Sequence, residues 1–501
     1  MNLSTLLELP ATGLAERPAI TSGDVMITYE ELLERSARVA GWLQSREVEH
    51  LAYLDVNSEA LPVAVFASAR AGLPFVPLNY RLTDDQLRAT LERVAPAVTL
   101  LDINTAERLG PVPGIEYVDR DAFLAASETG GPGQVPSETD AGDGPAWLLF
   151  TSGTSGAPKA AVLRHQHLTS YVLGTVPCMG ASGDEASLVS VPPYHVAGLM
   201  AVLSGVYAGR RLVYLPAFDE REWVRCVREQ DVTHAMVVPT MLRRILDALE
   251  DDAGGLPSLR SISYGGGRMP VPVIERALEL LPGVDFVNGY GLTETSSTIA
   301  VLTAEDHREA VSSDDPAVRR RLGSVGRPLP TVEVEIRSEE GEPLPPNHAG
   351  EIWVRGEQVS GEYLGRGAVT QEGWLATRDH GWVDEEGYLY VEGRLDDVIV
   401  RGGENMSPGE IEEVLLRHPQ VAEAAVVGVP DEQWGERVAA FVVPTADEPP
   451  EADELREWVR ERLRSSRVPE DVEFRPALPY TSTGKLLRRA LREDVTAEAH
   501  T

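Results

Sequence analysis

Short apolar runs alternate with helical patterns of apolar residues through the first part of the chain. Residues 27–47 and 59–71 carry apolar side chains at helical spacing, the first set beginning after a threonine cap. The runs Leu51–Asp55 and Val98–Leu101 have the composition of buried strands. Strands that alternate with helices predict a mainly parallel α/β sheet.

The pattern changes to short strands separated by turns at about residues 323–393. Val332–Ile336, Gly350–Arg355 and Gly387–Val391 are examples of such strands. Alternation of apolar and polar residues is typical of strands that bury one face. We therefore predict a β-rich subdomain in this part of the chain.

The last part of the chain predicts a compact α+β unit. A helical pattern from Pro408 to His418 is followed by the strand-like run Val421–Val429. Ser407 precedes the helix, Pro408 occupies its first position, and Glu410 stands where a capping box needs it. These residue types predict that the helix begins here and is capped by Ser407 and Glu410.

Composition narrows the classes of function. The 501 residues carry a net charge of −34, which opposes binding to nucleic acids and anionic membrane surfaces. The two cysteines, Cys178 and Cys226, form neither a disulfide framework nor a metal-ligand pattern. Neither a signal-peptide pattern nor an uncharged apolar run of transmembrane length is present. We expect a cytoplasmic protein, a monomer or homodimer, without membrane insertion or a nucleic-acid partner.

The stretch Phe150–Lys159 has the chemistry of a polyphosphate cradle. It follows the apolar run Ala146–Leu149 and combines hydroxyl side chains, glycines and one lysine. Glycines let backbone N–H groups converge on an anion, and hydroxyls and an ammonium add donors. The spacing is not that of a P-loop. The candidate phosphate-binding residues are Thr151, Ser152, Gly153, Thr154, Ser155, Gly156 and Lys159.

Lysine is almost absent outside two glycine-rich and hydroxyl-rich segments. Of the 45 basic residues, Lys159 and Lys485 are lysines and the others are arginines. Lysine supplies a compact rotatable charge, whereas arginine supplies a planar fork. Two ordinary surface lysines would explain the pattern as well, but we favour a chemical requirement for an ammonium at both places.

Further polar residues lie in glycine-rich settings. His195 stands between a strand and a helix, and a structural histidine is the simpler interpretation of it alone. The triple glycine Gly265–Gly267 offers either a backbone surface for a flat ligand or a plain turn. The segment Asn288–Glu294 places an aromatic, a hydroxyl and a carboxylate at a strand end, where open α/β sheets bind ligands. Glu294 could hold Mg²⁺ there.

Two charged motifs flank the end of the β-rich region. Thr377–Asp379 and Gly393–Asp397 each combine an arginine with aspartates. An aspartate can accept hydrogen bonds from ribose hydroxyls, and an arginine can pair with a phosphate. Taken singly, both motifs are equally typical of turns with a surface ion pair. The glycine-rich turn Arg401–Asn405 follows them.

In order and together, these motifs resemble the adenylate-forming superfamily of acyl-CoA and aryl-CoA ligases, luciferases and peptide-synthetase adenylation domains. The resemblance covers nearly the whole chain. Its motifs are Thr28-Tyr29-x-Glu-Leu, Ala71–Asn79, the Thr-Ser-Gly-Thr cradle, Pro-x-x-His, Tyr-Gly-x-Thr-Glu, Gly323–Pro328, Gly-Arg-x-x-Asp and Pro479-x-x-Ser-x-Gly-Lys-x-x-Arg488.

The resemblance implies a domain organisation and roles for individual residues. It implies an adenylation core over residues 1–393, a hinge over 394–396 that contains Asp396, and a mobile C-terminal domain over 397–501. The cradle with Lys159, and also Asn288, Tyr290, Asp379 and Arg394, would bind ATP. Lys485, Glu294, Thr293 and His195 would be catalytic, with Glu294 as the Mg²⁺ ligand. His195, Gly265, Gly266, Gly267, Gly289 and Ser296 would face the acyl group, and Gly402 and Gly403 would line the path of coenzyme A (CoA).

The chain departs from the family pattern at three motifs. The usual Thr-Gly-Asp is Thr377-Arg378-Asp379, so an arginine stands where glycine is usual. The glycine that often follows the cradle lysine is Ala160, and Gly-Gly-Ala-Pro is replaced by Gly265-Gly266-Gly267-Arg268. The last change touches the acyl pocket and leaves the substrate class open. On its own, Arg268 is best interpreted as a solvated arginine.

The resemblance implies ATP-dependent activation of a monocarboxylic acid to an acyl adenylate, followed by transfer to CoA in a stand-alone ligase. An alternative keeps the adenylation step but uses a carrier-protein thiol or an amine as acceptor, or a non-carboxylate oxyanion such as nitrite. A catalytically silent nucleotide sensor is a third hypothesis. The presence of both lysines, Glu294 and Asp379 argues against it.

Overall fold

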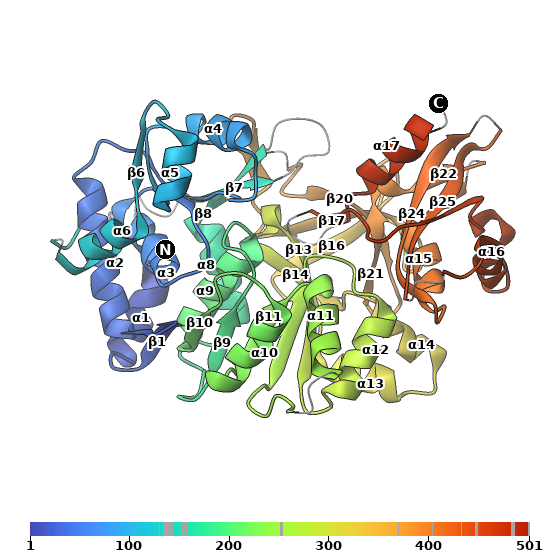
Figure 1. The fold of residues 1–501 in the computed structure, drawn as a ribbon, viewed down its shortest axis with the longest axis horizontal. Coiled ribbons are helices and arrows are strands. Elements are labelled where there is room, and N and C mark those ends of the chain that lie inside the picture. Colours follow the sequence, from blue (N-terminus) through green and yellow to red (C-terminus); the bar gives the residue numbers. More distant parts are fainter. Residues whose placement is uncertain are drawn as a thin grey trace.

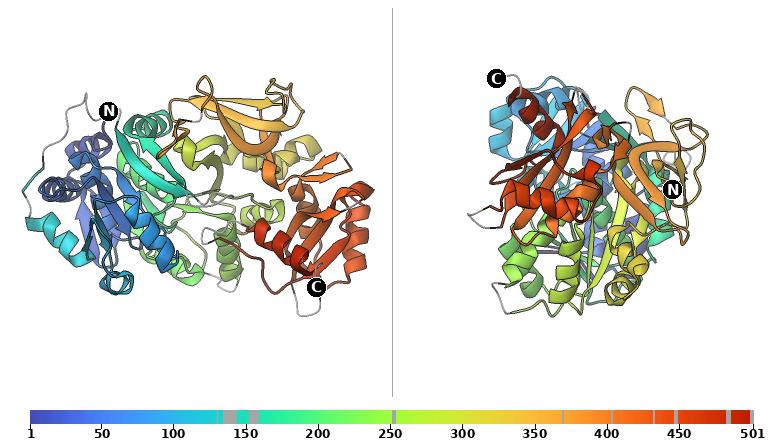
Figure 2. Two further views of the ribbon diagram at one scale, coloured as in Figure 1. Left: turned by 90° about the horizontal axis from the view of Figure 1, so that it is seen from above. Right: turned by 90° about the vertical axis from the view of Figure 1, so that its right-hand side faces the viewer.

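The computed structural model describes residues 1–129, 131–133, 144–151, 159–250, 254–368, 370–402, 404–431, 433–445, 449–481 and 486–498. Within these residues the strands form sheets of nine, eight, five and four strands. Helices cover the two largest sheets, and the C-terminal part, coloured orange to red, lies at the opposite end of the molecule from the first helices (Figures 1 and 2).

The nine-stranded sheet is parallel at its centre and antiparallel at both edges, whereas the eight-stranded sheet is antiparallel at one edge only. The nine-stranded sheet has the order β15-β14-β13-β12-β11-β9-β10-β1-β2. Its strands are β1 (Pro18–Ser22), β2 (Val25–Thr28), β9 (Ala186–Val189), β10 (Arg211–Tyr214), β11 (His234–Val237), β12 (Ser261–Gly265), β13 (Asp285–Leu292), β14 (Ser297–Leu302) and β15 (Arg327–Pro328). The eight-stranded sheet has the order β19-β18-β8-β7-β4-β3-β5-β6. Its strands are β3 (His50–Leu54), β4 (Phe75–Pro77), β5 (Ala97–Leu101), β6 (Ile115–Val118), β7 (Pro145–Thr151), β8 (Lys159–Arg164), β18 (Glu362–Tyr363) and β19 (Gly367–Ala368).

The predicted alternation of strands and helices is confirmed. The helices of the first part are α1 (Thr5–Gly13), α2 (Tyr29–Gln44), α3 (Ala60–Ala71), α4 (Asp84–Glu92), α5 (Ile103–Leu109), α6 (Arg120–Thr129), α8 (His165–Thr175), α9 (Val196–Ala208), α10 (Glu220–Glu229), α11 (Pro239–Glu250), α12 (Val271–Leu280), α13 (Ala304–Ser312) and α14 (Pro316–Arg319). Thr28 and Glu31 form a capping box at the start of α2, and Gly72 ends α3 with a φ of 75°.

Residues 323–393 are rich in strands, as predicted, but they are not one separate sheet. β16 (Val332–Arg337), β17 (Gly350–Gly356), β20 (Leu375–Val383) and β21 (Leu389–Arg394) form the four-stranded antiparallel sheet. β15 joins the nine-stranded sheet, and β18 joins the eight-stranded sheet beside β8. Period-two patterning predicts a strand but not its partner, because the partner lies far away in the sequence.

The C-terminal residues form a small α+β domain. Its antiparallel strands are β22 (Ile399–Arg401), β23 (Glu404–Met406), β24 (Val421–Asp431) and β25 (Gly435–Pro444), and β26 (Asp471–Phe474) adds a parallel edge. Its helices are α15 (Pro408–Leu416), α16 (Ala452–Arg460) and α17 (Arg488–Glu498). We refer to residues 397–498 as the small domain and to the residues before 394 as the core. The boundary at 394–396 stays a prediction.

The predicted capping box of α15 does not form. Ser407 is the N-cap residue and Pro408 follows it, as expected, but Ser407 makes no side-chain bond to the helix. Its hydroxyl donates instead to the carbonyl oxygen of Glu392 in β21 at 2.8 Å, and Glu410 pairs with Arg467. A hydroxyl has one proton to donate, and here that proton ties α15 to the last strand of the core.

Candidate active site

A buried carboxylate lies between a tyrosine and an arginine from different strands. Tyr290 Oη in β13 donates to Asp379 Oδ2 at 2.6 Å, and Arg394 Nη1 in β21 donates to Asp379 Oδ1 at 2.8 Å. Asp379 and Arg394 are direct partners in the β20–β21 ladder, so the register of two strands fixes the pair. Asp379 is 5% exposed. Its remaining lone pairs can accept further hydrogen bonds, for example from sugar hydroxyls.

Electrostatics keep this cluster in one protonation state. Burial and the charge of Asp379 raise the pKa of the Tyr290 phenol well above its ordinary value, so the phenol remains a donor. Burial lowers the pKa of Arg394, but Asp379, Tyr290 and Glu294 together raise it above its ordinary value. Glu294 contributes to the same increase, which places its carboxylate within electrostatic reach of Arg394.

A second cluster joins Glu294, Tyr363 and Lys159. Glu294 lies in the short 3₁₀ helix η1 (Thr293–Thr295), and its Oε1 accepts a hydrogen bond from Tyr363 Oη at 2.6 Å. Lys159 Nζ lies 5.8 Å from the centroid of the Tyr363 ring. Burial and the charge of Glu294 raise the pKa of Tyr363, so this phenol also stays neutral. The cluster brings a carboxylate, a phenol and an ammonium to one place.

Pairing between distant strands builds this second cluster. Tyr363 in β18 pairs with Ala161 in β8, the strand that begins at Lys159. Sequence analysis did not identify Tyr363, because a tyrosine in a turn-rich stretch has no spacing that marks it. The signal that could have found it is the strand partner, and that partner becomes visible only in the fold.

The two ends of the predicted cradle lie opposite each other. Thr151 pairs with Lys159 in the β7–β8 ladder, and Thr151 Oγ1 donates to the carbonyl oxygen of Lys159 at 3.3 Å. The loop that the sequence assigns to phosphate binding therefore begins and ends at adjacent backbone positions. Several predicted residues lie outside the described part of the chain, and their roles stay predictions: Ser152, Gly153, Thr154, Ser155, Gly156, Gly403 and Lys485.

The predicted acyl-facing residues fall into different environments. His195 is the N-cap residue of α9, and its ring centroid lies 4.6 Å from that of Tyr194. A Cβ at Gly265 would stand 2.3 Å from the carbonyl oxygen of Gly289, so this glycine allows β12 and β13 to approach closely. Gly266 has a φ of 77°, which favours glycine. A Cβ at Gly267 would make only ordinary contacts with Pro239.

Three neighbouring predictions concern the strand β13 and the turn after it. Asn288 is buried and its amide donates to the carbonyl oxygen of Ser324 at 3.3 Å. Thr293 opens η1. Ser296 is fully buried, and its hydroxyl donates to the carbonyl oxygen of Gln358 at 2.9 Å. The hydroxyl of Ser296 is thus engaged inside the protein, which its predicted contact with the acyl group did not anticipate.

The predicted hinge and CoA residues lie at the border of the small domain. Asp396 is in the 3₁₀ helix η3 (Leu395–Asp397), and its Oδ1 accepts from Arg378 Nη2 at 2.9 Å. Gly402 turns the chain between β22 and β23 with a φ of 58° and donates its N–H to the carbonyl oxygen of Trp434 at 2.7 Å.

A metal site made of protein groups alone is not found among the described residues, which contain no suitable group of three His, Cys, Asp or Glu side chains. A single carboxylate such as Glu294 nevertheless fits Mg²⁺, which usually combines one or two carboxylates with phosphate oxygens of the substrate. None of the described helices has the length and apolar character that crossing a membrane requires.

Comparison with known proteins identifies the family. Residues 7–364 match the model of the AMP-binding enzyme family, and residues 410–485 match the model of its C-terminal domain. A feruloyl-CoA synthase from Amycolatopsis sp is 35% identical over 95% of this chain and 95% of its own length. The fatty acid–[acyl-carrier-protein] ligase ScoC from Streptomyces coeruleorubidus is 34% identical over 95% and 93%.

A solved relative shows the same architecture. The o-succinylbenzoate CoA synthetase from Bacillus subtilis, in complex with its acyl-adenylate intermediate, superposes with a TM-score of 0.83 at 31% identity over 97% of both chains. Its complex with ATP and magnesium superposes with a TM-score of 0.82. The large N-terminal domain and the small C-terminal domain predicted from the sequence are thereby confirmed.

Proposed function

The chain belongs to the AMP-binding enzyme family, in the branch of acyl-CoA and aryl-CoA synthetases, and we propose that its own substrate is a flat aromatic monocarboxylate. The reaction of this branch uses ATP to convert a carboxylic acid into an acyl adenylate, releases pyrophosphate, and transfers the acyl group to the thiol of CoA. The adenylation chemistry is supported by Asp379, held between Tyr290 and Arg394, and by the cluster of Glu294, Tyr363 and Lys159. The aromatic acid is supported by the likeness to a feruloyl-CoA synthase and by the triple glycine, where Gly266 and Gly267 leave room for a flat ligand.

In the first step a carboxylate oxygen of the acid attacks the α-phosphorus of ATP, and the bond from that phosphorus to the leaving pyrophosphate breaks. We assign the ribose hydroxyls to Asp379, because its buried carboxylate is fixed by two donors and retains acceptor capacity. Lys159 would attract the outer phosphates from the start of β8. Lys485 would neutralise charge between the two reacting anions, which is largely what limits such a step.

Mg²⁺ would be held by Glu294 together with phosphate oxygens, and it would neutralise phosphate charge when bound. Tyr363 orients the Glu294 carboxylate through one oxygen and leaves the other available. A residue that orients a metal ligand in this way restricts where the carboxylate can point.

In the second step the CoA thiol attacks the carbonyl carbon of the adenylate, the thioester bond forms, and AMP leaves with the electron pair of the broken C–O bond. The acyl adenylate is reactive, so exclusion of water protects it. We assign entry of the thiol to the turn of Gly402 and Gly403, brought to the site by movement of the small domain.

The environment of Arg268 supports an acid with a single carboxylate. A second carboxylate on the substrate would need a cation, and Arg268 is the basic residue that follows the triple glycine directly. Its guanidinium pairs with Glu413 of the small domain at 2.9 Å. The side chains nearest to Gly266, Gly267 and Gly289 are those of Val238, Pro239 and Thr298, which are uncharged.

Transfer to a carrier-protein thiol is the second candidate, favoured by the ligase ScoC among the relatives. The test is ATP–pyrophosphate exchange with hydroxycinnamates, benzoates, fatty acids and 2-succinylbenzoate, followed by thioester formation with CoA or with carrier proteins bearing phosphopantetheine. We expect the highest kcat/KM with an aromatic monocarboxylate and CoA. Preference for fatty acids and carrier proteins would establish the second candidate, and exchange with 2-succinylbenzoate alone would contradict the monocarboxylate assignment.

A further inference from the structure

Two arginines that depart from the family pattern pair with carboxylates at the border of the small domain: Arg268 with Glu413 of that domain, and Arg378 with Asp396 of the predicted hinge. Arg268 stands where the family pattern Gly-Gly-Ala-Pro has its proline, and it donates to Glu413 Oε2 in α15 at 2.9 Å. Arg378 stands where the family pattern Thr-Gly-Asp has its glycine, and it donates to Asp396 Oδ1 in η3 at 2.9 Å. Arg268 is 40% exposed, as expected for a solvated arginine, but it also has a carboxylate partner that the sequence did not indicate.

Arg268 lies directly over the first turn of α15. A Cβ placed on Gly409 would stand 1.5 Å from Arg268 Nη1, so only a glycine leaves room for the guanidinium there. The N-terminus of a helix carries partial positive charge and does not itself attract a cation. The carboxylate of Glu413, one turn further along α15, is therefore what holds Arg268 in this position.

Arg378 adopts a backbone conformation that favours glycine. Its φ is 64°, in the left-handed region that residues with a Cβ occupy at a cost of about 1 kcal/mol or more. An unusual conformation that persists is held by its surroundings and is a reasonable place to look for function. Here the arginine side chain gains an ion pair with the predicted hinge residue Asp396, which a glycine at this position would lack.

A third ion pair also joins an arginine of the core to a carboxylate of the small domain. Arg243 in α11 forms an ion pair with Glu423 in β24 and donates to the carbonyl oxygen of Ala422. Tyr480 Oη donates to the other carboxylate oxygen of Glu423 at 2.8 Å. Glu423 therefore bonds Arg243 of the core through one carboxylate oxygen and Tyr480 of its own domain through the other.

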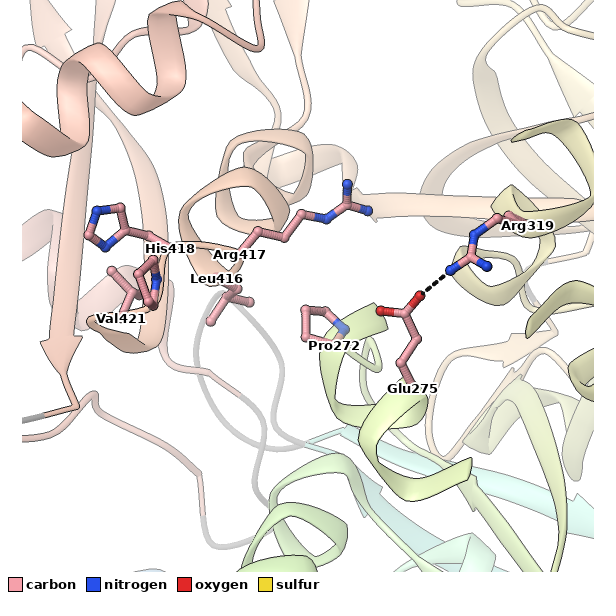
Figure 3. Close-up of a pocket in the computed structure, with 8 residues that line it drawn as sticks. Pro272, Glu275, Arg319, Leu416, Arg417, His418 and Val421 are labelled. Atoms are coloured by element: carbon pink, nitrogen blue, oxygen red, sulfur yellow. Dashed lines mark hydrogen bonds and ion pairs between the residues drawn. The ribbon is translucent and has the colours of Figure 1, made fainter. Parts of the chain in front are cut away.

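A cleft occupies part of the border between the domains. A cleft of about 580 Å³ lies between α12 and α14 on the core side and the residues after α15, and Arg417 extends into it from the small domain (Figure 3). The lining is mostly polar: Glu275 and Arg319 pair within the core, while Arg417 pairs with Glu413. A hydrated, polar border lets a domain separate and return more readily than a packed apolar one does.

We propose that Arg268 and Arg378 are positioning residues that clamp the small domain onto the core in the orientation described here. The clamp stabilises one stage of the reaction cycle and must open before the small domain can rotate. Its assignment to the adenylation stage rests on the proposed function, because that is where Lys485 is assigned to act. The pairs are partly exposed, and each should favour the clamped orientation by about two- to fivefold.

The direct test measures orientation without any reaction. Spin labels are placed at the exposed residues Glu279 in α12 and Glu451 before α16, on a Cys178→Ser/Cys226→Ser background, and interdomain distances are recorded by pulsed electron resonance. Arg268→Gln and Arg378→Gly should each reduce the clamped population, and the double variant should reduce it further. Arg276→Gln is the matched control, since Arg276 in α12 pairs with Asp247 and Glu250 inside the core.

A second variant keeps the charge of Arg268 but displaces its guanidinium from Glu413. Gly409→Ala should displace the guanidinium of Arg268 and reduce the clamped population, because the methyl group occupies its place. In an Arg268→Gln background the same substitution should have little further effect. Independent, additive effects would mean that Gly409 does not act through Arg268, and this would contradict the clamp.

The rates of the two half-reactions then separate the existence of the clamp from its assignment to the adenylation stage. In single-turnover assays, Arg268→Gln should slow adenylate formation about two- to fivefold and leave thioester formation from supplied acyl adenylate unchanged or faster. A distance distribution for Arg268→Gln identical to that of Arg276→Gln overturns the clamp. A shifted distribution with only the thioester step slowed keeps the clamp but overturns the assignment of this orientation, and of Lys485, to adenylation.

Discussion

The carboxylate of Glu294 shares a hydrogen bond with the phenol of Tyr363, and both groups lie beside Lys159. At the residue scale, this contact restricts where the carboxylate of Glu294, the predicted metal ligand, can point. The phenol stays neutral because burial and Glu294 raise its pKa. The carboxylate is therefore oriented by a donor that does not add charge.

Removing either partner should change the use of Mg²⁺. We expect Glu294→Gln to lower the overall rate mainly through metal and ATP use. Tyr363→Phe should be milder, raising the Mg²⁺ concentration for half-maximal rate on the order of tenfold, as for the loss of a group that orients a metal ligand. The measurement is rate against Mg²⁺ at saturating acid. Tyr117→Phe, whose phenol bonds the carbonyl oxygen of Gly110 far from this cluster, is the control. Glu294→Gln with wild-type Mg²⁺ and ATP dependence would exclude Glu294 as the ligand.

Gly289 tests the position of the acyl pocket. Gly289→Leu should exclude longer or bulkier acids while ATP binding survives, because the new side chain would occupy space beside the triple glycine. A Cβ at this position would stand 3.1 Å from Thr298 Oγ1, so Thr298 must shift slightly and Gly289→Ala is the gentler first variant. The measurement is kcat/KM over a series of acids, with the exposed Gly283→Leu as control. An unchanged acid profile would place the pocket elsewhere.

Sequence reasoning identified charged and glycine-rich residues well but not their partners. Tyr290, Asp379 and Arg394 were each singled out from motifs, and the structure brings the three side chains together. Tyr363 and the pairing of Arg268 with Glu413 were missed, because each joins segments that are adjacent only after folding. Local pattern carries no information on such contacts.

At the scale of single elements, α8 begins with two histidines that must remain neutral. His165 Nδ1 accepts the backbone N–H of Leu3, and His167 Nδ1 accepts that of Arg164, both at 3.2 Å. Burial lowers the pKa of each ring to about 4, with the N-terminal amino group adding to the effect at His165 and Arg164 at His167. Protonation would abolish both accepted hydrogen bonds.

The pH dependence of unfolding follows from these values. A histidine whose folded pKa lies below its ordinary 6.5 stabilises the fold above pH 6.5, and this contribution is lost as the pH falls from 6.5 to about 4. In that window each ring changes the slope of unfolding free energy by up to about 1.4 kcal/mol per pH unit. In urea unfolding at a series of pH values, we expect His165→Gln to reduce the slope of unfolding free energy against pH by the contribution of about one proton. His348→Gln, at an exposed site, should leave it unchanged, and an equal slope in both variants would contradict the assignment.

Elements with strong local signals were predicted closely. α2 begins directly after the threonine cap Thr28, and α3 ends at Ala71 as the pattern over 59–71 predicted, because a capping box and a left-handed glycine act within one turn. The capping box of α15 was wrong for the opposite reason. Ser407 had the local signal, but its hydroxyl is directed to the carbonyl oxygen of Glu392 in β21 and accepts no backbone N–H of the first turn of α15.

At the scale of the whole molecule, domain movement predicts that residues of one small domain act at different stages. Lys485→Ala should depress adenylation about 10²- to 10³-fold, as for one lost transition-state donor, yet convert supplied acyl adenylate to thioester. A bulky residue at Gly403 should do the reverse. Asp396→Pro should spare adenylation and slow transfer, since proline fixes φ at the predicted hinge. Single-turnover assays of both steps decide this, and equal impairment of both steps by Lys485→Ala would contradict domain alternation.

The order of domains was predictable from the sequence, whereas their mutual orientation was not. The change in strand pattern after residue 323 and the helix at Pro408 located the parts of the chain. Their arrangement depends on ion pairs such as Arg243 with Glu423, which join surfaces that no periodic pattern marks.

The core supplies the cations at this border and the other side supplies the anions, which has a consequence for exchanging C-terminal domains between related enzymes. The core contributes the cations Arg243, Arg268 and Arg378, and the other side contributes the anions Glu423, Glu413 and Asp396. A transplanted C-terminal domain should therefore dock more readily if it brings acidic residues at the positions of Glu413 and Glu423 and if Asp396 of the predicted hinge is kept, whatever its own catalytic competence. A donor with lysine or arginine there should fold but dock in a smaller fraction of molecules, and restoring the acids should raise that fraction in the hybrid enzyme.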